Sequence, residues 1–84
     1  IDYHYQTFLV LADCLDYATT AQELCLSKPA VTQHIHYLET DLEVKLFQNQ
    51  GGNLVLTKKG NLLKDRLVVI NEHIDDLLRS LASK

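Results

Sequence analysis

Residues 28–42 combine small or polar side chains with apolar ones at helical spacing. The apolar positions are separated by 4, 3 and 4 residues, which puts them on one side of a helix: Val31, Ile35, Leu38 and Leu42. The opposite side has no carboxylate and carries small or polar groups: Pro29, Thr32, Gln33 and His36. Side chains of this kind can bond to base edges and phosphates in the major groove of DNA. The pattern predicts a helix with one face in a core and the other turned to nucleic acid.

The candidate DNA-binding residues of this helix and its cap are Ser27, Lys28, Pro29, Ala30, Thr32, Gln33 and His36. Lys28 has no acid nearby in the sequence and could contact a phosphate or a guanine. Gln33 can bond adenine through two hydrogen bonds, and the Thr32 methyl group can meet a thymine methyl. The alternative is that these are ordinary solvated side chains, since most polar residues are exposed in any protein.

A turn at residues 25–27 separates this helix from a shorter one, as in a helix-turn-helix. Ser27 is a suitable N-cap, and Pro29 fits the first helical turn, where a missing N–H costs little. The shorter helix is expected over residues 19–24. Thr19 and Gln22 could form a capping box at its start, and Asp16 is a competing cap.

The N-terminal segment, residues 3–15, is expected to form the first helix, because its apolar side chains share one stripe: Tyr5, Phe8, Leu9, Ala12 and Leu15. Cys14 and Cys25 lack the spacing of a zinc site or a disulfide framework. We expect both to be small buried hydrophobic residues in a reducing cytoplasm.

Two short strand-like runs, residues 46–47 and 54–57, flank a turn-rich segment at 48–53. A hairpin after a helix-turn-helix is typical of a winged helix. Asn49, Gln50 and Asn53 could reach the minor groove or the DNA backbone from this wing. The alternative is an ordinary hairpin turn, because Gly and Asn are common turn residues.

A long helix is expected from residue 58, with Thr57 as its N-cap and with Lys58 and Lys59 as phosphate contacts. Its apolar residues follow a heptad pattern: Leu63, Leu67, Ile70, Ile74, Leu77 and Leu81. A core of about sixty residues is too small to cover such a helix. We therefore expect the seam to meet a second copy of the chain. The alternative is that it packs on Phe8 and Leu11 of the same chain.

Together these elements predict a mainly α fold: a winged helix-turn-helix of three helices and a two-stranded wing over residues 1–57, then a linker and dimerisation helix over 58–84. The chain has 84 residues and a net charge of −3. Its acids avoid residues 24–38 and 44–64, so an acidic molecule can still keep one face open to phosphates. We expect weak, salt-sensitive non-specific binding.

Other functional classes find little support in the sequence. It has no nucleophile–base–orienter set and no phosphate-binding glycine loop, so we expect neither an enzyme nor a cofactor. His34 and His36 point apart on a helix, so no metal site is expected. Its apolar runs are too short to cross a membrane. The chain begins with Ile1 rather than Met, which suggests a fragment of a longer cytoplasmic protein.

The order of the elements over residues 3 to about 82 resembles the N-terminal DNA-binding domain of LysR-type bacterial transcriptional regulators. The motifs that carry the resemblance are Tyr5-x-x-Phe8-Leu9, Ala21-x-x-Leu24, Ser27-Lys28-Pro29-Ala30-Val31-Thr32-Gln33-x-Ile35, Leu38-Glu39-x-x-Leu42, Leu46-Phe47 and Leu56-Thr57-x-x-Gly60. The chain departs from the family where Arg or Lys is common, near Gln33, His36 and Tyr37 and in the wing. It has Glu43 where the family usually has Gly.

The resemblance implies sequence-specific binding to double-stranded DNA, at interrupted palindromes with A·T-rich elements, by heads that dimerise through antiparallel linker helices. It also implies a C-terminal effector domain, absent from this chain, where a small molecule would bind. The alternative function is a winged-helix dimerisation or protein-interaction module with weak or no DNA binding. Salt-dependent DNA binding separates the two.

Overall fold

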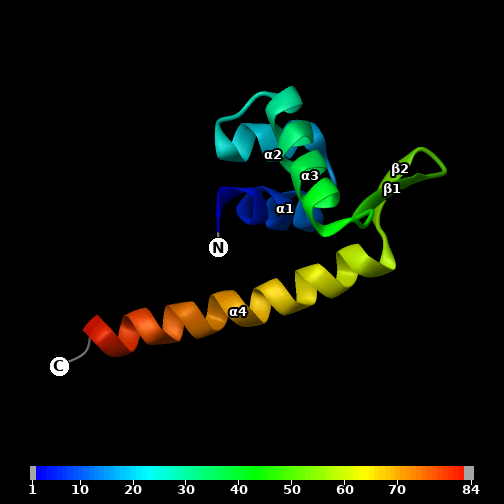
Figure 1. The fold of residues 1–84 in the computed structure, drawn as a ribbon. Helices are drawn as coiled ribbons and strands as arrows, with labels where there is room; N and C mark the ends of the chain where they lie inside the picture. The colour runs from blue at the N-terminus through cyan, green and yellow to red at the C-terminus, as the bar shows by residue number, and fades with distance from the viewer. Residues whose placement is uncertain (1, 83–84) are drawn as a thin grey trace.

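The computed structural model describes residues 2–82, and within them the chain forms a compact head with a projecting hairpin and a long C-terminal helix (Figure 1). The expected outer domain limits at residues 1 and 84 lie outside the described residues. The elements, in order, are α1 (Tyr3–Cys14), α2 (Tyr17–Leu24), α3 (Lys28–Leu42), β1 (Phe47–Gln50), β2 (Asn53–Leu56) and α4 (Lys58–Ala82). The predicted winged helix-turn-helix with a long following helix is confirmed.

The first turns of α2 and α3 are held by side-chain caps. The Ser27 hydroxyl accepts a hydrogen bond from the Ala30 amide at 3.2 Å, as the sequence predicts. At α2 the predicted capping box is wrong, because Asp16 is the cap and accepts a bond from the Thr19 amide at 2.9 Å. The helix therefore begins at Tyr17 rather than Thr19.

The three helices of the head each end in a left-handed residue that is not glycine: Leu15, Cys25 and Glu43, with φ of 55°, 56° and 57°. The left-handed backbone at Glu43 explains why glycine suits that position, since glycine adopts this conformation without strain.

The prediction that both cysteines are buried is wrong, because Cys25 is exposed in the turn and Cys14 is only half-buried.

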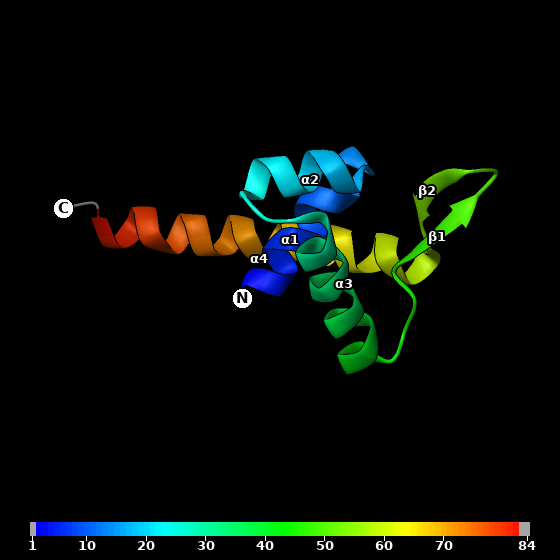
Figure 2. The ribbon, with the colours of Figure 1, turned by 90° about the horizontal axis from the view of Figure 1, so that it is seen from above.

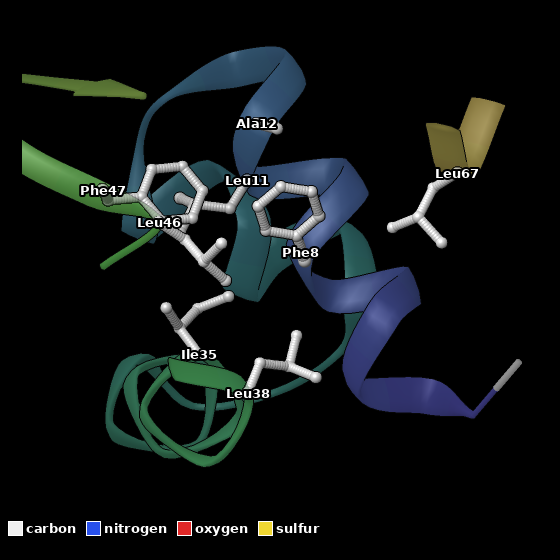
Figure 3. Close-up of a cluster of buried hydrophobic side chains, with 8 residues drawn as sticks. All are labelled: Phe8, Leu11, Ala12, Ile35, Leu38, Leu46, Phe47 and Leu67. Carbon is white, nitrogen blue, oxygen red and sulfur yellow. The ribbon is translucent and has the colours of Figure 1, made fainter. Parts of the chain in front are cut away.

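The core lies where α1 crosses α3 and the base of the wing (Figure 3). Its buried members are Phe8, Leu11, Ala12, Ile35, Leu38, Leu46, Phe47 and Leu67. Val31 is also fully buried, so three of the four apolar positions predicted on α3 are core. The fourth, Leu42, is 37% exposed because it closes the last turn of the helix, at the edge of the head.

The wing is an antiparallel hairpin in which Phe47 pairs with Leu56 and Gln50 pairs with Asn53. Its strands reach further than the sequence suggests, and only Gly51 and Gly52 form the turn. Both have positive φ, 60° and 83°, which a tight two-residue hairpin turn requires. Residues 48–50 were expected in the turn but belong to β1, where cross-strand pairing outweighs their low strand preference.

The base of the wing is tied to α3 and α4 by two side chains. Glu39 accepts a hydrogen bond from the Leu46 amide at 2.7 Å through Oε2. The Thr57 hydroxyl donates to the Lys45 carbonyl at 2.5 Å and accepts from the Gly60 amide at 3.0 Å. Thr57 is therefore the N-cap of α4, as predicted. These bonds fix where the wing and α4 leave the head.

Helix α4 runs along the head and then continues beyond it, away from the wing (Figures 1 and 2). Leu67 is 4% exposed in the core, and Leu63 packs against that core. The expectation that the whole seam meets a second copy is therefore wrong for Leu67, because its own head covers it. Ile70, Ile74, Leu77 and Leu81 are exposed. Among the described helices, none is long and apolar enough to cross a membrane.

Candidate nucleic-acid interface

The outer face of α3 is the best-defined surface of the head, because core packing on Val31, Ile35 and Leu38 fixes which way it points. Its predicted contact residues are all exposed: Lys28, Pro29, Thr32, Gln33 and His36. Ser27 is exposed too, but its hydroxyl is used as the cap, and Ala30 is half-buried. The Thr32 hydroxyl donates to the Lys28 carbonyl at 3.2 Å, so this residue can offer a base its methyl group and an acceptor oxygen.

The same face extends toward the C-terminal end of α3 through three residues that the sequence reasoning missed. Tyr37, Thr40 and Asp41 share a shallow surface depression with Thr32, Gln33 and His36. The Tyr37 ring stacks on His4 of α1, with ring centroids 4.0 Å apart and an angle of 17° between the planes. Because this stacking orders the ring, Tyr37 can meet a partner with little further loss of side-chain freedom. The spacing of four residues from Gln33 to Tyr37 and Asp41 was a usable signal.

A groove joins the N-terminal ends of α2 and α3 to the wing. It brings predicted contact residues from two elements together, Lys28 and Thr32 from α3 with Asn49 and Asn53 from the hairpin. Gln50 is exposed beside the turn but does not line the groove. Asp16 lines it as well. The sequence has no acid close to Lys28, but the fold places the α2 cap in the same groove.

The Asp16 carboxylate is held in place by Thr19, whose amide and hydroxyl donate to Oδ2 at 2.9 and 2.5 Å. These hydrogen bonds lower the pKa of Asp16 below its ordinary value, and the positive charge of Lys28 lowers it further. The group is therefore a carboxylate at neutral pH. It places one fixed negative charge in a groove whose other charged residue is Lys28, and whose lining includes the apolar side chains of Leu15 and Leu54.

His34 does not belong to this surface. Its Nδ1 lies 2.9 Å from the Thr7 hydroxyl oxygen, and that hydroxyl donates to the Tyr3 carbonyl at 3.2 Å. His34 must then donate through Nδ1–H, so it joins α3 to α1. Desolvation lowers the pKa of His34, with a smaller effect from nearby His4. Within residues 2–82, no cluster of three or more His, Cys, Asp or Glu side chains could hold a metal ion.

Lys58 and Lys59 are exposed at the first turn of α4, directly after the wing. No acidic residue occurs in that first turn, so the helix N-terminus and the two ammonium groups attract anions together. Because Thr57 bonds the start of α4 to Lys45, the backbone at these lysines is held at the base of the wing. The predicted site residues thus lie on three connected parts of the head: α3, the wing and the start of α4.

Residues 3–61 match a protein-family model described as "Bacterial regulatory helix-turn-helix protein, lysR family". The chain is 40% identical over 57 residues to YxjO, an uncharacterised HTH-type transcriptional regulator of Bacillus subtilis, covering 68% of this chain and 20% of that protein. It is 41% identical over 54 residues to the HTH-type transcriptional regulator CitR of the same organism, covering 64% of this chain and 19% of CitR. The chain thus spans about a fifth of the length of these relatives.

Solved structures show the same architecture. A LysR-family transcriptional regulator from Eggerthella lenta is 41% identical, with a TM-score of 0.78 over 81% of this chain and 97% of that one. The BenM DBD in its benA site 1 DNA complex superposes with a TM-score of 0.88 over 95% of this chain and 93% of that one. At 18% identity, that second likeness speaks for the fold alone.

Proposed function

The chain belongs to the LysR family of bacterial regulatory helix-turn-helix proteins, and on this premise we propose that it binds specific double-stranded DNA as a dimer and so regulates transcription. The observation that carries the proposal is the outer face of α3. That face is exposed, free of acids from Lys28 to Tyr37, and held in a fixed direction by the buried opposite face. A surface with these properties suits the major groove.

In this proposal the N-terminal half of α3 reads bases. Gln33 is exposed at mid-helix and bonds the N6 and N7 groups of an adenine. Thr32 meets a thymine methyl group, since its hydroxyl proton is already bonded to the Lys28 carbonyl. Both preferences favour A·T pairs. Pro29 and His36 flank these two residues on the same face and contact a thymine methyl group and a phosphate, respectively.

The wing and the start of α4 hold the DNA backbone. Asn49 and Asn53 share a groove with Lys28, so one strand of DNA can meet α3 and the hairpin together. Gln50 adds a donor beside the turn, and the bare backbone at Gly51 and Gly52 allows close approach to phosphate or to the minor groove. Lys58 and Lys59 supply positive charge just beyond the wing. These contacts set position rather than sequence preference.

Dimerisation is proposed through the exposed half of α4. Its large apolar side chains, Ile70, Ile74, Leu77 and Leu81, are between 39% and 72% exposed on a helix that extends past the head. An exposed apolar stripe of this kind marks an interaction surface. A second copy pairs with it in antiparallel orientation and sets the spacing of two half-sites. A small-molecule effector would act through a further domain, which the greater length of the relatives can accommodate.

The test is selection from a random duplex pool with the purified chain at low and moderate salt, together with the mass of the chain in solution. We expect a two-fold symmetric, A·T-rich site whose recovery falls as salt rises, because bound phosphates release counterions. Recovery of no duplex at low salt from a chain with dimeric mass would contradict the proposal. That outcome would favour a winged helix retained for dimerisation or protein contact.

A further inference from the structure

The groove between α2, α3 and the wing contains one carboxylate among four predicted DNA-contact residues, and apolar residues of α2 and the wing line the rest of it. Asp16 lines this groove with Lys28, Thr32, Asn49 and Asn53. The other four are neutral or cationic, and all are residues of the proposed DNA surface. In the sequence Asp16 stands well away from them, so only the fold brings the charge into the groove.

Hydrogen bonds hold the Asp16 carboxylate at the start of α2, on the edge of the groove. Oδ2 accepts two hydrogen bonds from Thr19, one from the amide and one from the hydroxyl, at 2.9 and 2.5 Å. The backbone carbonyl of the same residue accepts a bond from the Thr20 hydroxyl at 2.9 Å, and Thr20 is fully buried. Rotating the side chain would uncap α2. The charge is thus fixed relative to α3 and the wing.

The position of this charge matters because it lies at a helix N-terminus. The first amides of a helix attract an anion, and a phosphate is the usual external one. Here the chain supplies its own anion at α2. The carboxylate therefore opposes a DNA phosphate approaching the groove, and it partly offsets the charge of Lys28, which lines the same groove.

We infer that Asp16 restrains DNA affinity: its fixed carboxylate in the groove weakens backbone contacts, so that stable binding depends more on base contacts made by α3. The inference rests on the proposed function and deepens it. A charge that opposes phosphate weakens every sequence alike. It therefore lowers binding to random DNA, where backbone contacts supply nearly all the affinity.

Asp16→Asn isolates the charge, because Asn caps helices about as well as Asp does. We expect the variant to bind both the selected site and a random duplex more tightly, by about eightfold per bound head at 0.1 M salt. The reason is that one anion fewer in each head acts as about one more released counterion, so the salt slope should steepen by about 0.9 per head and the gain should vanish toward 1 M salt. Asp16→Ser, which introduces another uncharged N-cap, should show the same gain in affinity and the same change in salt slope.

The matched control is Glu72→Gln, which makes the same change of charge at an exposed position in the distal half of α4. It should leave affinity within about twofold, since exposed charges separated by more than a Debye length are largely screened. The helix content and thermal midpoint of each variant verify that it is folded.

The outcomes separate this inference from the proposed function. If the parent chain binds its selected site and the two Asp16 variants bind no more tightly, the inference is wrong and the proposed function stands. If the parent chain binds weakly and the variants bind with the steeper salt slope, both hold. If neither the parent chain nor the variants bind any duplex at low salt, both are wrong.

Discussion

Gln33 and Lys58 are both exposed on the proposed DNA surface, but they should affect binding in different ways. Gln33→Ala should relax base preference at one or two base pairs per half-site, at a cost of about 1–3 kcal/mol on the preferred sequence. Lys58→Ala should instead weaken all sequences alike and reduce the salt slope by about one per head, because it removes a phosphate contact. Binding titrations on the selected site and on single-base variants measure both effects. An unchanged base preference in Gln33→Ala would show that α3 does not read DNA through this residue.

His34 makes the stability of the head depend on pH. Its pKa in the folded chain is lowered, chiefly by desolvation, below the ordinary value of 6.5. As the pH falls below 6.5, the unfolded chain takes up a proton more readily than the folded chain does. The stability that His34 contributes is therefore fully present above pH 6.5 and is lost as the pH falls through the folded pKa. The free energy of unfolding in urea, measured from pH 7.5 to 5.5 at one protein concentration, should fall.

His34→Gln should flatten this pH dependence, because Gln can still donate to the Thr7 hydroxyl but does not titrate. The matched control is His73→Gln, at an exposed position on α4, which should keep the slope of the parent chain. His4 is the other titratable group against the His34 ring, with ring centroids 5.3 Å apart, and it remains in both variants. An equal slope in all three chains would assign the pH dependence elsewhere.

At the scale of single residues, the sequence predicts positions on a helix well and proximity between helices poorly. Periodicity alone identified Thr32, Gln33 and His36 as exposed on one face of α3. The meeting of Asp16 with Lys28 could not be predicted, because it depends on how α2 packs against α3. The stacking of Tyr37 on His4 has the same cause, since it joins α1 to α3.

Gly60 shows how closely α4 packs on the base of the wing. A Cβ atom at this position would lie 2.1 Å from the Leu46 carbonyl oxygen and 2.9 Å from Leu56 Cδ2. Ala normally stabilises a helix relative to Gly by about 1 kcal/mol. Here Gly60→Ala should instead destabilise the chain by about 1–3 kcal/mol, because the backbone at Leu46 must move. Urea unfolding measures the change.

Asn61→Ala is the matched control for that prediction, since it lies next in the helix and is exposed. Its amide donates to the Thr57 carbonyl at 3.3 Å on the surface, so its loss should change stability by no more than about 0.5 kcal/mol. If Gly60→Ala proved as stable as the parent chain, α4 could shift away from the wing without cost. The proposed fixed position of Lys58 and Lys59 would then fail too.

Whole elements were predictable to the extent that a local pattern determines them. The Ser27 cap predicted where α3 begins, and the spacing of its apolar residues predicted where it ends. The strands of the wing were misjudged because Gln48, Asn49 and Gln50 have weak strand preference and are held by pairing with residues 53–55. The Leu38-Glu39 motif gave no hint of its role, since Glu39 acts by binding the amides of Leu46 and Phe47, which lie beyond the end of its helix.

At the scale of the whole molecule, the heptad residues of α4 belong to two different surfaces. Its first part, Leu63 and Leu67, packs on the head, while the part from Ile70 onward is exposed. The periodicity did not reveal where this change occurs, because it depends on where the head ends. Leu62 and Val69, outside the predicted seam, are also about half exposed and widen the apolar stripe on one flank. A stripe of this extent is what a second copy of the helix could cover.

Ile70→Glu and Val68→Glu form a matched pair that tests dimerisation. The two side chains are 44% and 43% exposed, but they lie about 160° apart around α4, with Ile70 on the proposed seam and Val68 on the opposite face. Ile70→Glu should raise the dimer dissociation constant at least about tenfold, because it puts an unpaired charge in an apolar contact. Val68→Glu should leave it within about twofold.

Sedimentation equilibrium over a range of protein concentrations measures both dissociation constants, and circular dichroism verifies that α4 stays helical. Two heads on one symmetric site bind cooperatively only when α4 joins them, so Ile70→Glu should also lose affinity for the full site while keeping its affinity for a half-site. Dissociation by Val68→Glu but not by Ile70→Glu would move the interface to the other face of the helix. A parent chain that stayed monomeric at every concentration would remove α4 as a sufficient dimerisation element and leave the pairing of heads to other parts of the protein.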